Sequence, residues 1–320
     1  HCHLCPTDIA ENRRFSNLYD LWLANDHYKW RAMRLNGEPE ELCSGDADPY
    51  DKFMAYARTI PYTLRNPLFH WTHLELKRYF GIDTLLNETT APEIWKKANA
   101  ALEQKDHSTW GILERHKVKM IGTTDDPIDD LSAHKKLARS ACPARVLPSF
   151  RPDSAYALND LQTWNKWTDQ LAAASGIECT NLANFKQALL QRIKHFKSLG
   201  CVASDHGLSH CPEKIASDSE ATKIFEHARK GQKDSNEYSI APDHIEAFTG
   251  HLLCWLGEQY KKNAWVMQLH IGAIRNVNRF IYHSYGADAG CDSIDDTSCS
   301  TCVTLSLIHI SEPTRQFRIA

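Results

Sequence analysis

The chain has 320 residues, of which 42% are hydrophobic and 24% charged, and its formal net charge is −3. These values are typical of a globular protein long enough to bury a large core, and they exclude the strongly basic surface that binds nucleic acid or acidic membranes. No apolar run approaches the roughly 20 residues of a membrane-spanning helix, and scattered cysteines in a chain of this size favour a reduced, cytoplasmic protein over a disulfide scaffold.

The chain begins with a His-x-His motif formed by His1 and His3. Side chains alternate along a strand, so both imidazoles would point to the same face and reach one divalent cation at the strand end. Imidazole suits Zn and neighbouring metals. The motif alone is weak evidence, because a terminal histidine pair can equally be exposed and without function.

Short apolar runs that end in polar or turn residues predict buried parallel strands. Helical patterns at 183–199 and 241–260 lie between the later runs, and Pro242 fits the start of the second helix. This alternation predicts an α/β fold, an incomplete (β/α)8 TIM-type barrel with about five of its eight strands. The predicted strands lie at 1–4, 118–124, 145–150, 201–204 and 265–271.

The segment between the first two predicted strands, residues 8–117, is too long for one crossover. Amphipathic patterns predict helices at 49–59, 70–80 and 92–102. We therefore expect a helical insertion after the first strand that covers the barrel mouth, where substrate-positioning residues are often found.

The end of the chain loses the strand and helix pattern and becomes rich in Ser, Thr and Cys. The string 305–315 resembles the in-frame translation of an adapter used in sequencing libraries. We assign residues 1–294 to the partial barrel and 295–320 to a non-native tail, with adapter read-through from 305. Because no Met precedes the opening motif, we also expect a segment to be missing upstream.

Seven segments in the same order resemble those of uronate isomerases, also called glucuronate isomerases, which belong to the amidohydrolase superfamily of metal-dependent barrels. The likeness runs through residues 1–294. It implies an aldose–ketose isomerase that converts D-glucuronate to D-fructuronate, and D-galacturonate to D-tagaturonate, through an enediol in bacterial hexuronate breakdown. The segments are HCHL at 1–4, DHYKWRAMR at 26–34, HWTHLELKRYF at 70–80, TTDDP at 123–127, FRPD at 150–153, ASDHG at 203–207 and MQLHIG at 267–272.

The resemblance implies roles for the first histidines and for a neighbouring His-Tyr pair. His1 and His3 match ligands of a divalent metal, which we expect to be Zn. Tyr28 matches a residue that shuttles a proton between two substrate oxygens, and His27 one that holds a substrate oxygen. A phenol can donate and accept, so the chemistry is reasonable.

Polar residues at the ends of later predicted strands are expected to bind the substrate. Arg151 matches a substrate-binding cation, because a guanidinium offers a two-pronged partner for a carboxylate, although an ion pair with a nearby aspartate is the alternative. Asp205, His206 and His270 are expected to face the same site. For His270 a metal ligand and a pocket residue remain equally open.

Two features that the resemblance leads us to expect are absent from the sequence. The sequence lacks the Trp-rich segment and the Asp-x-Arg motif to which the resemblance assigns the third metal ligand, the base and a second carboxylate-binding arginine. We therefore expect the full-length parent to be an isomerase of a small sugar acid, with a homo-oligomer left open, and this chain to be inactive. A metal-dependent hydrolase of the same superfamily and a non-catalytic fragment remain as alternatives. The hydrolase would need a lysine or glutamate where Ser204, Asp205 and His206 stand.

Overall fold

The structure is a computed structural model that describes residues 1–231 and 239–296. It divides into two compact units, and each is described by itself. The sheet unit comprises residues 1–10, 119–273 and the described residues 295–296; the helical unit comprises residues 11–118 and 274–294. In the described part of the chain, no helix is long and apolar enough to cross a membrane. Most of the expected tail, residues 297–320, lies outside the described residues.

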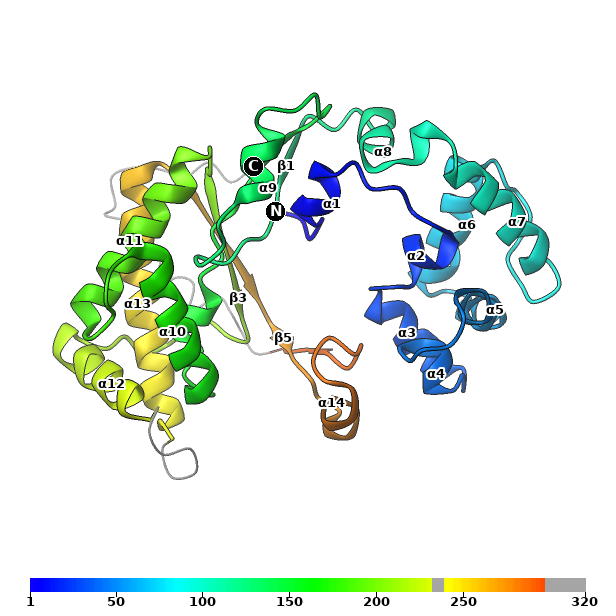
Figure 1. Ribbon diagram of the computed structural model, residues 1–320. Helices are drawn as coiled ribbons and strands as arrows, with labels where there is room; N and C mark the ends of the chain where they lie inside the picture. The colour runs from blue at the N-terminus through cyan, green and yellow to red at the C-terminus, as the bar shows by residue number, and fades with distance from the viewer. Residues whose placement is uncertain (232–238, 297–320) are drawn as a thin grey trace. The chain divides into compact units, whose positions relative to one another are not determined.

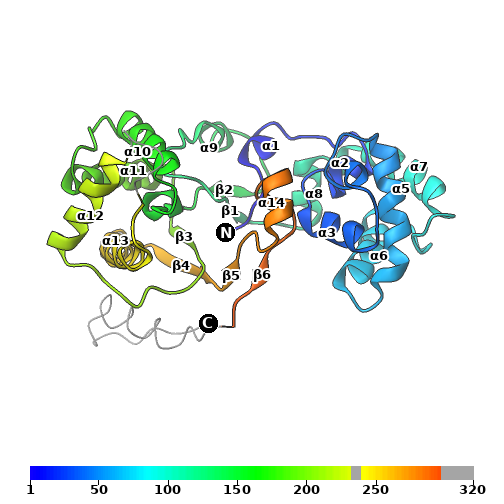
Figure 2. The ribbon, with the colours of Figure 1, turned by 90° about the horizontal axis from the view of Figure 1, so that it is seen from below.

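Four parallel strands form the centre of the sheet unit: β1 (Met120–Gly122), β2 (Arg145–Leu147), β3 (Ala203–Leu208) and β4 (Val266–Ile271). β1 pairs with β2 and β3 pairs with β4, both in parallel. Phe150 joins the two pairs, because it forms parallel bridges with Asp125 on one side and Ser204 on the other. The four strands therefore follow one another in chain order. Figure 2 labels all four of them.

The strand prediction differs from the structure in several bounds. β1 is shorter than the predicted strand at 118–124, and β3 runs to Leu208 instead of ending at 204, so Asp205 and His206 lie within the strand and not after it. No strand forms at 1–4, where the backbone makes one hydrogen bond to β1, from the Cys2 amide to the Gly122 carbonyl. A single bond does not make a ladder. β2 ends at Leu147 rather than continuing to 150, because Pro148 has no amide hydrogen to donate.

Long helices provide most of the apolar core of the sheet unit. In Figure 1, α10 (Leu161–Ser175), α11 (Leu182–Ser198), α12 (Asp218–Lys230) and α13 (Pro242–Asn263) form one group. Their buried rings pack together with Phe150, and α13 begins with a proline in its first turn as predicted. The shorter elements of the unit are α1 (Pro6–Ala10), α9 (Ser132–Leu137) and η3 (Asp153–Tyr156).

The helical unit has a second core, in which Phe53, Tyr56, Leu76 and Ile94 are all buried. The three predicted helices are confirmed; the second starts earlier than predicted because Asn66 caps its first turn and Pro67 follows. The elements are α2 (Leu18–Trp22), α3 (His27–Leu35), α4 (Glu40–Cys43), α5 (Pro49–Thr59), η1 (Ile60–Thr63), α6 (Pro67–Phe80), α7 (Ala91–Leu102), η2 (Lys105–His107), α8 (Thr109–Arg115) and α14 (Arg279–Tyr285). The short strands β5 (Ala273–Ile274) and β6 (Ser293–Ile294) pair with each other.

Candidate functional site

The register of β3 and β4 decides which polar side chains share a face. Asp205 lies opposite Gln268 and Gly207 lies opposite His270. Because side chains alternate along a strand, Asp205, Gln268 and His270 point to one face of the sheet. His206 points to the other face, toward α13.

Three side chains on this face, or next to it, form a group that can hold a metal ion. His1, Asp205 and His270 each offer one ligand atom, and the three atoms lie within 4.8 Å of one another. The His270 Nδ1 atom lies 2.5 Å from Asp205 Oδ1, and the His1 Nε2 atom lies 3.5 Å from Asp205 Oδ2. The carboxylate of Asp205 is fully buried. The described residues contain no other group of three or more such ligands.

The chain start is held at this group by Gln268. The Nδ1 atom of His1 lies 3.2 Å from Gln268 Oε1. The Nε2 atoms of His1 and His3 lie 3.4 Å apart. The two imidazoles therefore approach each other, although no strand forms there.

The donor set suits a divalent cation. Two imidazoles and a carboxylate are ligands typical of Zn and of several first-row metals. A buried carboxylate is costly unless cationic or donor groups surround it. Asp205 Oδ2 lies beside Arg151 and His1, whereas Asp205 Oδ1 has no hydrogen-bond partner among the described residues, although His270 Nδ1 lies 2.5 Å away. The residues present therefore fit a metal ion.

Arg151 lies at the edge of this group and contacts two carboxylates. Its Nη1 atom lies 3.3 Å from Asp205 Oδ2, and its Nε atom donates to Asp153 Oδ2 at 2.8 Å. Burial lowers the pKa of Arg151, but the hydrogen bond that Arg151 donates to Asp153 and the nearby charges of both aspartates outweigh burial and raise this pKa. The guanidinium is therefore a fixed cation beside the candidate metal ligands.

Asp153 is the residue that orients this arginine. Besides Arg151, its carboxylate accepts the Gly207 amide at 3.0 Å and the Tyr156 hydroxyl at 2.6 Å. A Cβ atom on Gly207 would lie 2.5 Å from Arg151 Nη2 and 3.0 Å from Asp153 Oδ2. The absence of a side chain at Gly207 therefore leaves the space that the guanidinium occupies.

His206 is placed differently from its neighbour Asp205. Its side chain has no exposed surface, and its ring centre lies 5.7 Å from that of Tyr260 on α13. Burial lowers the pKa of His206 to about 4, so the imidazole is neutral near pH 7. Its Nδ1 atom lies 3.3 Å from the Tyr156 hydroxyl. This position supports packing behind the strand rather than direct contact with a bound molecule.

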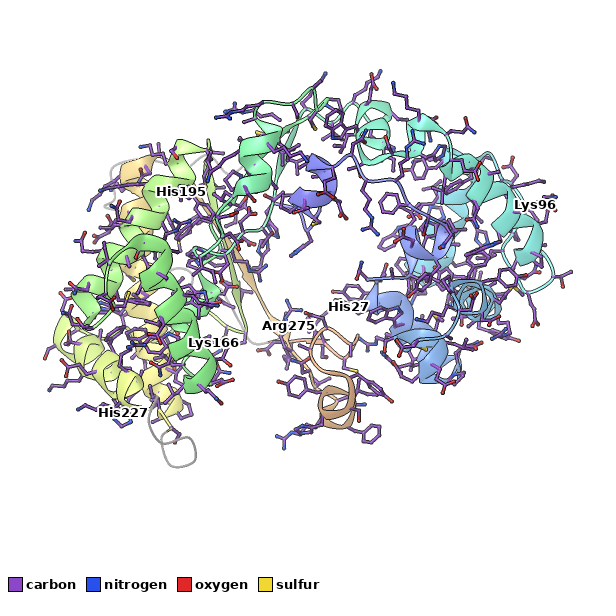
Figure 3. The ribbon with its side chains drawn as sticks, in the orientation of Figure 1. His27, Lys96, Lys166, His195, His227 and Arg275 are labelled. Carbon is purple, nitrogen blue, oxygen red and sulfur yellow. The ribbon has the colours of Figure 1, made fainter. Side chains whose placement is uncertain are left out.

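His27 and Tyr28 form the first turn of α3 in the helical unit, and Figure 3 shows His27 there. The side chain of Asp26 caps this turn by accepting the amides of Tyr28 and Lys29, both at 3.1 Å. The ring centres of His27 and Tyr28 lie 4.4 Å apart. The Tyr28 ring is exposed and lines a cavity of about 560 Å³ together with Arg31 and Trp71.

The segment after α14 packs against α3 within the same unit. Arg31 donates to the Asp292 carbonyl at 3.0 Å, and Arg34 donates to the Ala289 carbonyl. Gly290 has φ of +83°, and a Cβ atom there would collide with the His27 carbonyl. A glycine is therefore required where this segment crosses the turn that carries His27.

A separate buried polar cluster lies at the end of β1. The Thr123 hydroxyl lies 2.7 Å from Asp125 Oδ2 and 2.7 Å from His134 Nε2. Burial raises the pKa of Asp125 to about 6 and lowers that of His134 to about 4. Near pH 7 a neutral imidazole therefore lies beside a carboxylate that is costly to ionise.

Of the predicted site residues, the sheet unit brings together His1, His3, Arg151, Asp205 and His270. The sequence did not single out Gln268 or Gly207, and it considered Asp153 only as an ion-pair partner. Gln268 was detectable, because it lies two positions before His270 on a predicted strand and so shares its face. The roles of Asp153 and Gly207 depend on a tertiary contact between the start of η3 and β3, which no local pattern reveals.

Comparisons with known proteins point to one family. The family model described as glucuronate isomerase matches residues 1–314. The uronate isomerase of Solibacter usitatus is 46% identical over 296 residues, which cover 92% of this chain and 62% of that protein. The uronate isomerase of Caldanaerobacter subterraneus is 46% identical over 297 residues, with the same coverage. The chain thus spans less than two thirds of the length of these relatives.

Solved structures agree with the sequence comparison. The crystal structure of uronate isomerase from Thermotoga maritima superposes with a TM-score of 0.90 at 30% identity, covering 96% of this chain and 66% of that one. Glucuronate isomerase from Caulobacter crescentus gives a TM-score of 0.87 at 24% identity, which supports the α/β fold alone.

Proposed function

The chain belongs to the glucuronate isomerase family, and we propose that it forms the metal-binding and sugar-acid-binding part of an enzyme that interconverts aldose and ketose uronates. The observation that carries this proposal is the group formed by His1, Asp205 and His270. We assign these three residues as ligands of a divalent ion, with Zn as the first candidate and His3 within reach of His1 as a further ligand. When bound, the ion supplies Lewis acidity that polarises substrate oxygens.

Arg151 is proposed to bind the substrate carboxylate. It is a cation fixed by Asp153 next to the candidate ligands, and a guanidinium can meet a carboxylate with two parallel hydrogen bonds. His270 is assigned as a ligand rather than a pocket residue, because its Nδ1 atom already contacts the Asp205 carboxylate.

Tyr28 and His27 are proposed to act in proton transfer and in holding a substrate oxygen, as the family resemblance implies. An isomerisation through an enediol moves a proton between two neighbouring oxygens, and a phenol both donates and accepts. The exposed ring of Tyr28 and its place on a capped helix turn are consistent with this role.

The finer architecture is also a proposal. We infer that the four parallel strands are part of a (β/α)8 barrel, that residues 8–117 are an insertion after its first strand, and that 295–320 are a non-native tail. The nine free cysteines among the described residues are consistent with a cytoplasmic location.

Binding is the experiment that tests this function. The untagged chain loaded with Zn²⁺ is titrated with D-glucuronate in a calorimeter, and D-glucose serves as the matched ligand without a carboxylate. We expect glucuronate to bind more tightly than glucose and to lose this preference in Arg151→Gln. Equal affinity for the two sugars in the unmodified chain would contradict the proposal.

Turnover is tested separately by measuring D-fructuronate formation. Because the sequence contains no Asp-x-Arg motif, we expect binding with little or no isomerisation. Isomerisation at a rate typical of enzymes, with a kcat of roughly 1 per second or more, would show that this motif is not needed.

A further inference from the structure

Arg151 contacts one of the proposed metal ligands directly. Its Nη1 atom and the His1 Nε2 atom both lie beside the same oxygen, Asp205 Oδ2, at 3.3 Å and 3.5 Å. The other oxygen of Asp205 faces His270. The negative charge of Asp205 therefore lies beside a permanent cation and two imidazoles.

Asp153 holds a different part of the same guanidinium. It accepts a hydrogen bond at 2.8 Å from Nε, the nitrogen that joins the guanidinium to the aliphatic part of the side chain. Asp153 is itself fixed by the Gly207 amide and the Tyr156 hydroxyl. Arg151 thus makes one contact with a proposed metal ligand, Asp205, and one with a residue outside the metal site, Asp153.

The two contacts respond differently to a bound cation. A carboxylate that shares its charge with a divalent ion attracts a neighbouring guanidinium less, whereas the hydrogen bond to Asp153 is unaffected. The two Nη atoms are then free to meet a carboxylate end-on, while Nε remains bound to Asp153.

We propose that Arg151 couples the two binding events: Asp205 restrains its guanidinium in the metal-free chain, and metal binding to Asp205 makes it available to the carboxylate of a sugar acid, with Asp153 as the positioning residue. This inference rests on the proposed function. It adds that metal and sugar acid bind with positive cooperativity and that the coupling passes through Arg151.

The test is a set of calorimetric titrations of the untagged chain. D-glucuronate is titrated with and without saturating Zn²⁺, and Zn²⁺ is titrated with and without D-glucuronate. We expect Zn²⁺ to tighten glucuronate binding by roughly 5- to 100-fold, and glucuronate to tighten Zn²⁺ binding by the same factor, since coupling free energies are reciprocal.

Variants locate the coupling. In Arg151→Gln we expect Zn²⁺ binding to persist and the coupling factor to fall to about one. In Asp153→Asn we expect Zn²⁺ affinity to be unchanged while glucuronate affinity of the metal-loaded chain falls about tenfold, or ~1.4 kcal/mol. Arg151→Lys keeps the charge without the fork, so intermediate coupling is expected even if Arg151→Gln folds poorly.

The outcomes separate this inference from the proposed function. Coupling that persists in Arg151→Gln would mean that the sugar acid meets the ion directly, which overturns the inference and leaves the function standing. Independent binding of the two ligands in the unmodified chain also overturns it. Failure to bind either ligand would contradict the proposed function itself.

Discussion

The Asp205 carboxylate lies 2.5 Å from the His270 imidazole, and the two residues come from neighbouring parallel strands. This contact follows from the strand register, which sets Asp205 opposite Gln268 and so brings Asp205 and His270 to the same face. A shift of one residue would turn His270 to the opposite face. Two of the three candidate metal ligands, Asp205 and His270, are thus fixed by the sheet.

Gly207→Ala should weaken sugar-acid binding with little effect on folding. The added Cβ atom would lie 2.5 Å from Arg151 Nη2, the far end of a flexible side chain that can move. We expect the free energy of unfolding to change by less than about 1 kcal/mol, whereas D-glucuronate affinity falls about tenfold because Arg151 leaves its place. Urea unfolding and calorimetry measure the two effects. Unchanged affinity would show that Arg151 does not bind the carboxylate.

Gly290→Ala should loosen the first turn of α3, which carries His27 and Tyr28. The alanine would adopt a positive φ and collide with the His27 carbonyl. We expect a loss of stability of roughly 2–4 kcal/mol, the sum of left-handed strain and overpacking. Hydrogen exchange at the amides of α3 reports the loosening.

Gly37→Ala is the matched control for this variant. Gly37 also has a positive φ, +86°, but a Cβ atom there would meet nothing within 4 Å. We expect it to cost only the backbone strain, about 1–2 kcal/mol, with hydrogen exchange in the first turn of α3 unchanged. Equal effects of the two variants would refute the role of the contact between Gly290 and His27.

The free energy of unfolding of Asp125→Asn should increase relative to that of the unmodified chain as pH rises. Burial raises the pKa of Asp125 from 3.8 to about 6. The unmodified chain therefore loses stability as pH rises from about 4 to about 6, and the loss stays constant at higher pH. The asparagine does not ionise, and the variant should gain roughly 1–3 kcal/mol over the unmodified chain between about pH 4 and pH 7.

His134 acts in the opposite direction. Burial lowers its pKa to about 4, so the folded chain loses stability as pH falls from about 6.5 toward 4. Because the His134 Nε2 atom lies 3.7 Å from Asp125 Oδ1, the two proteins are compared at pH 5 and above, where this imidazole is neutral in the folded chain. Urea midpoints at about pH 5 and pH 7.5 give the difference. A difference that is constant, or that falls with pH, would contradict the predicted burial of Asp125.

The sequence predicted the main elements because local patterns determine them. The helices at Pro49–Thr59 and Leu182–Ser198, and the strand β4, show clear apolar patterns and end signals, whereas β3 was predicted only in its first residues because its second half is polar. The predicted strand at 1–4 failed because a strand needs a partner ladder, and whether one forms is a tertiary property. Propensity alone does not decide it.

The site was predicted in part for the same reason. Residues at strand ends were identified because parallel strands place their carboxyl ends at one edge. Whether Asp205 or His206 faces the candidate ligands depends on the pleat and register of β3, which the polar sequence at 204–206 does not reveal. The placement of Asp153 depends on a tertiary contact with the Gly207 amide, which lies 54 positions away along the chain.

The most direct test of the account is a zinc titration of the untagged chain, comparing the unmodified protein with Asp205→Asn and His270→Asn. His210→Asn is the control, because His210 is exposed and lies outside the three-residue group. We predict one tightly bound ion per chain, lost or weakened at least tenfold in both site variants and retained in the control. Binding that survives both site variants, or no binding by the unmodified chain, would contradict the assignment of His1, Asp205 and His270 as the metal site.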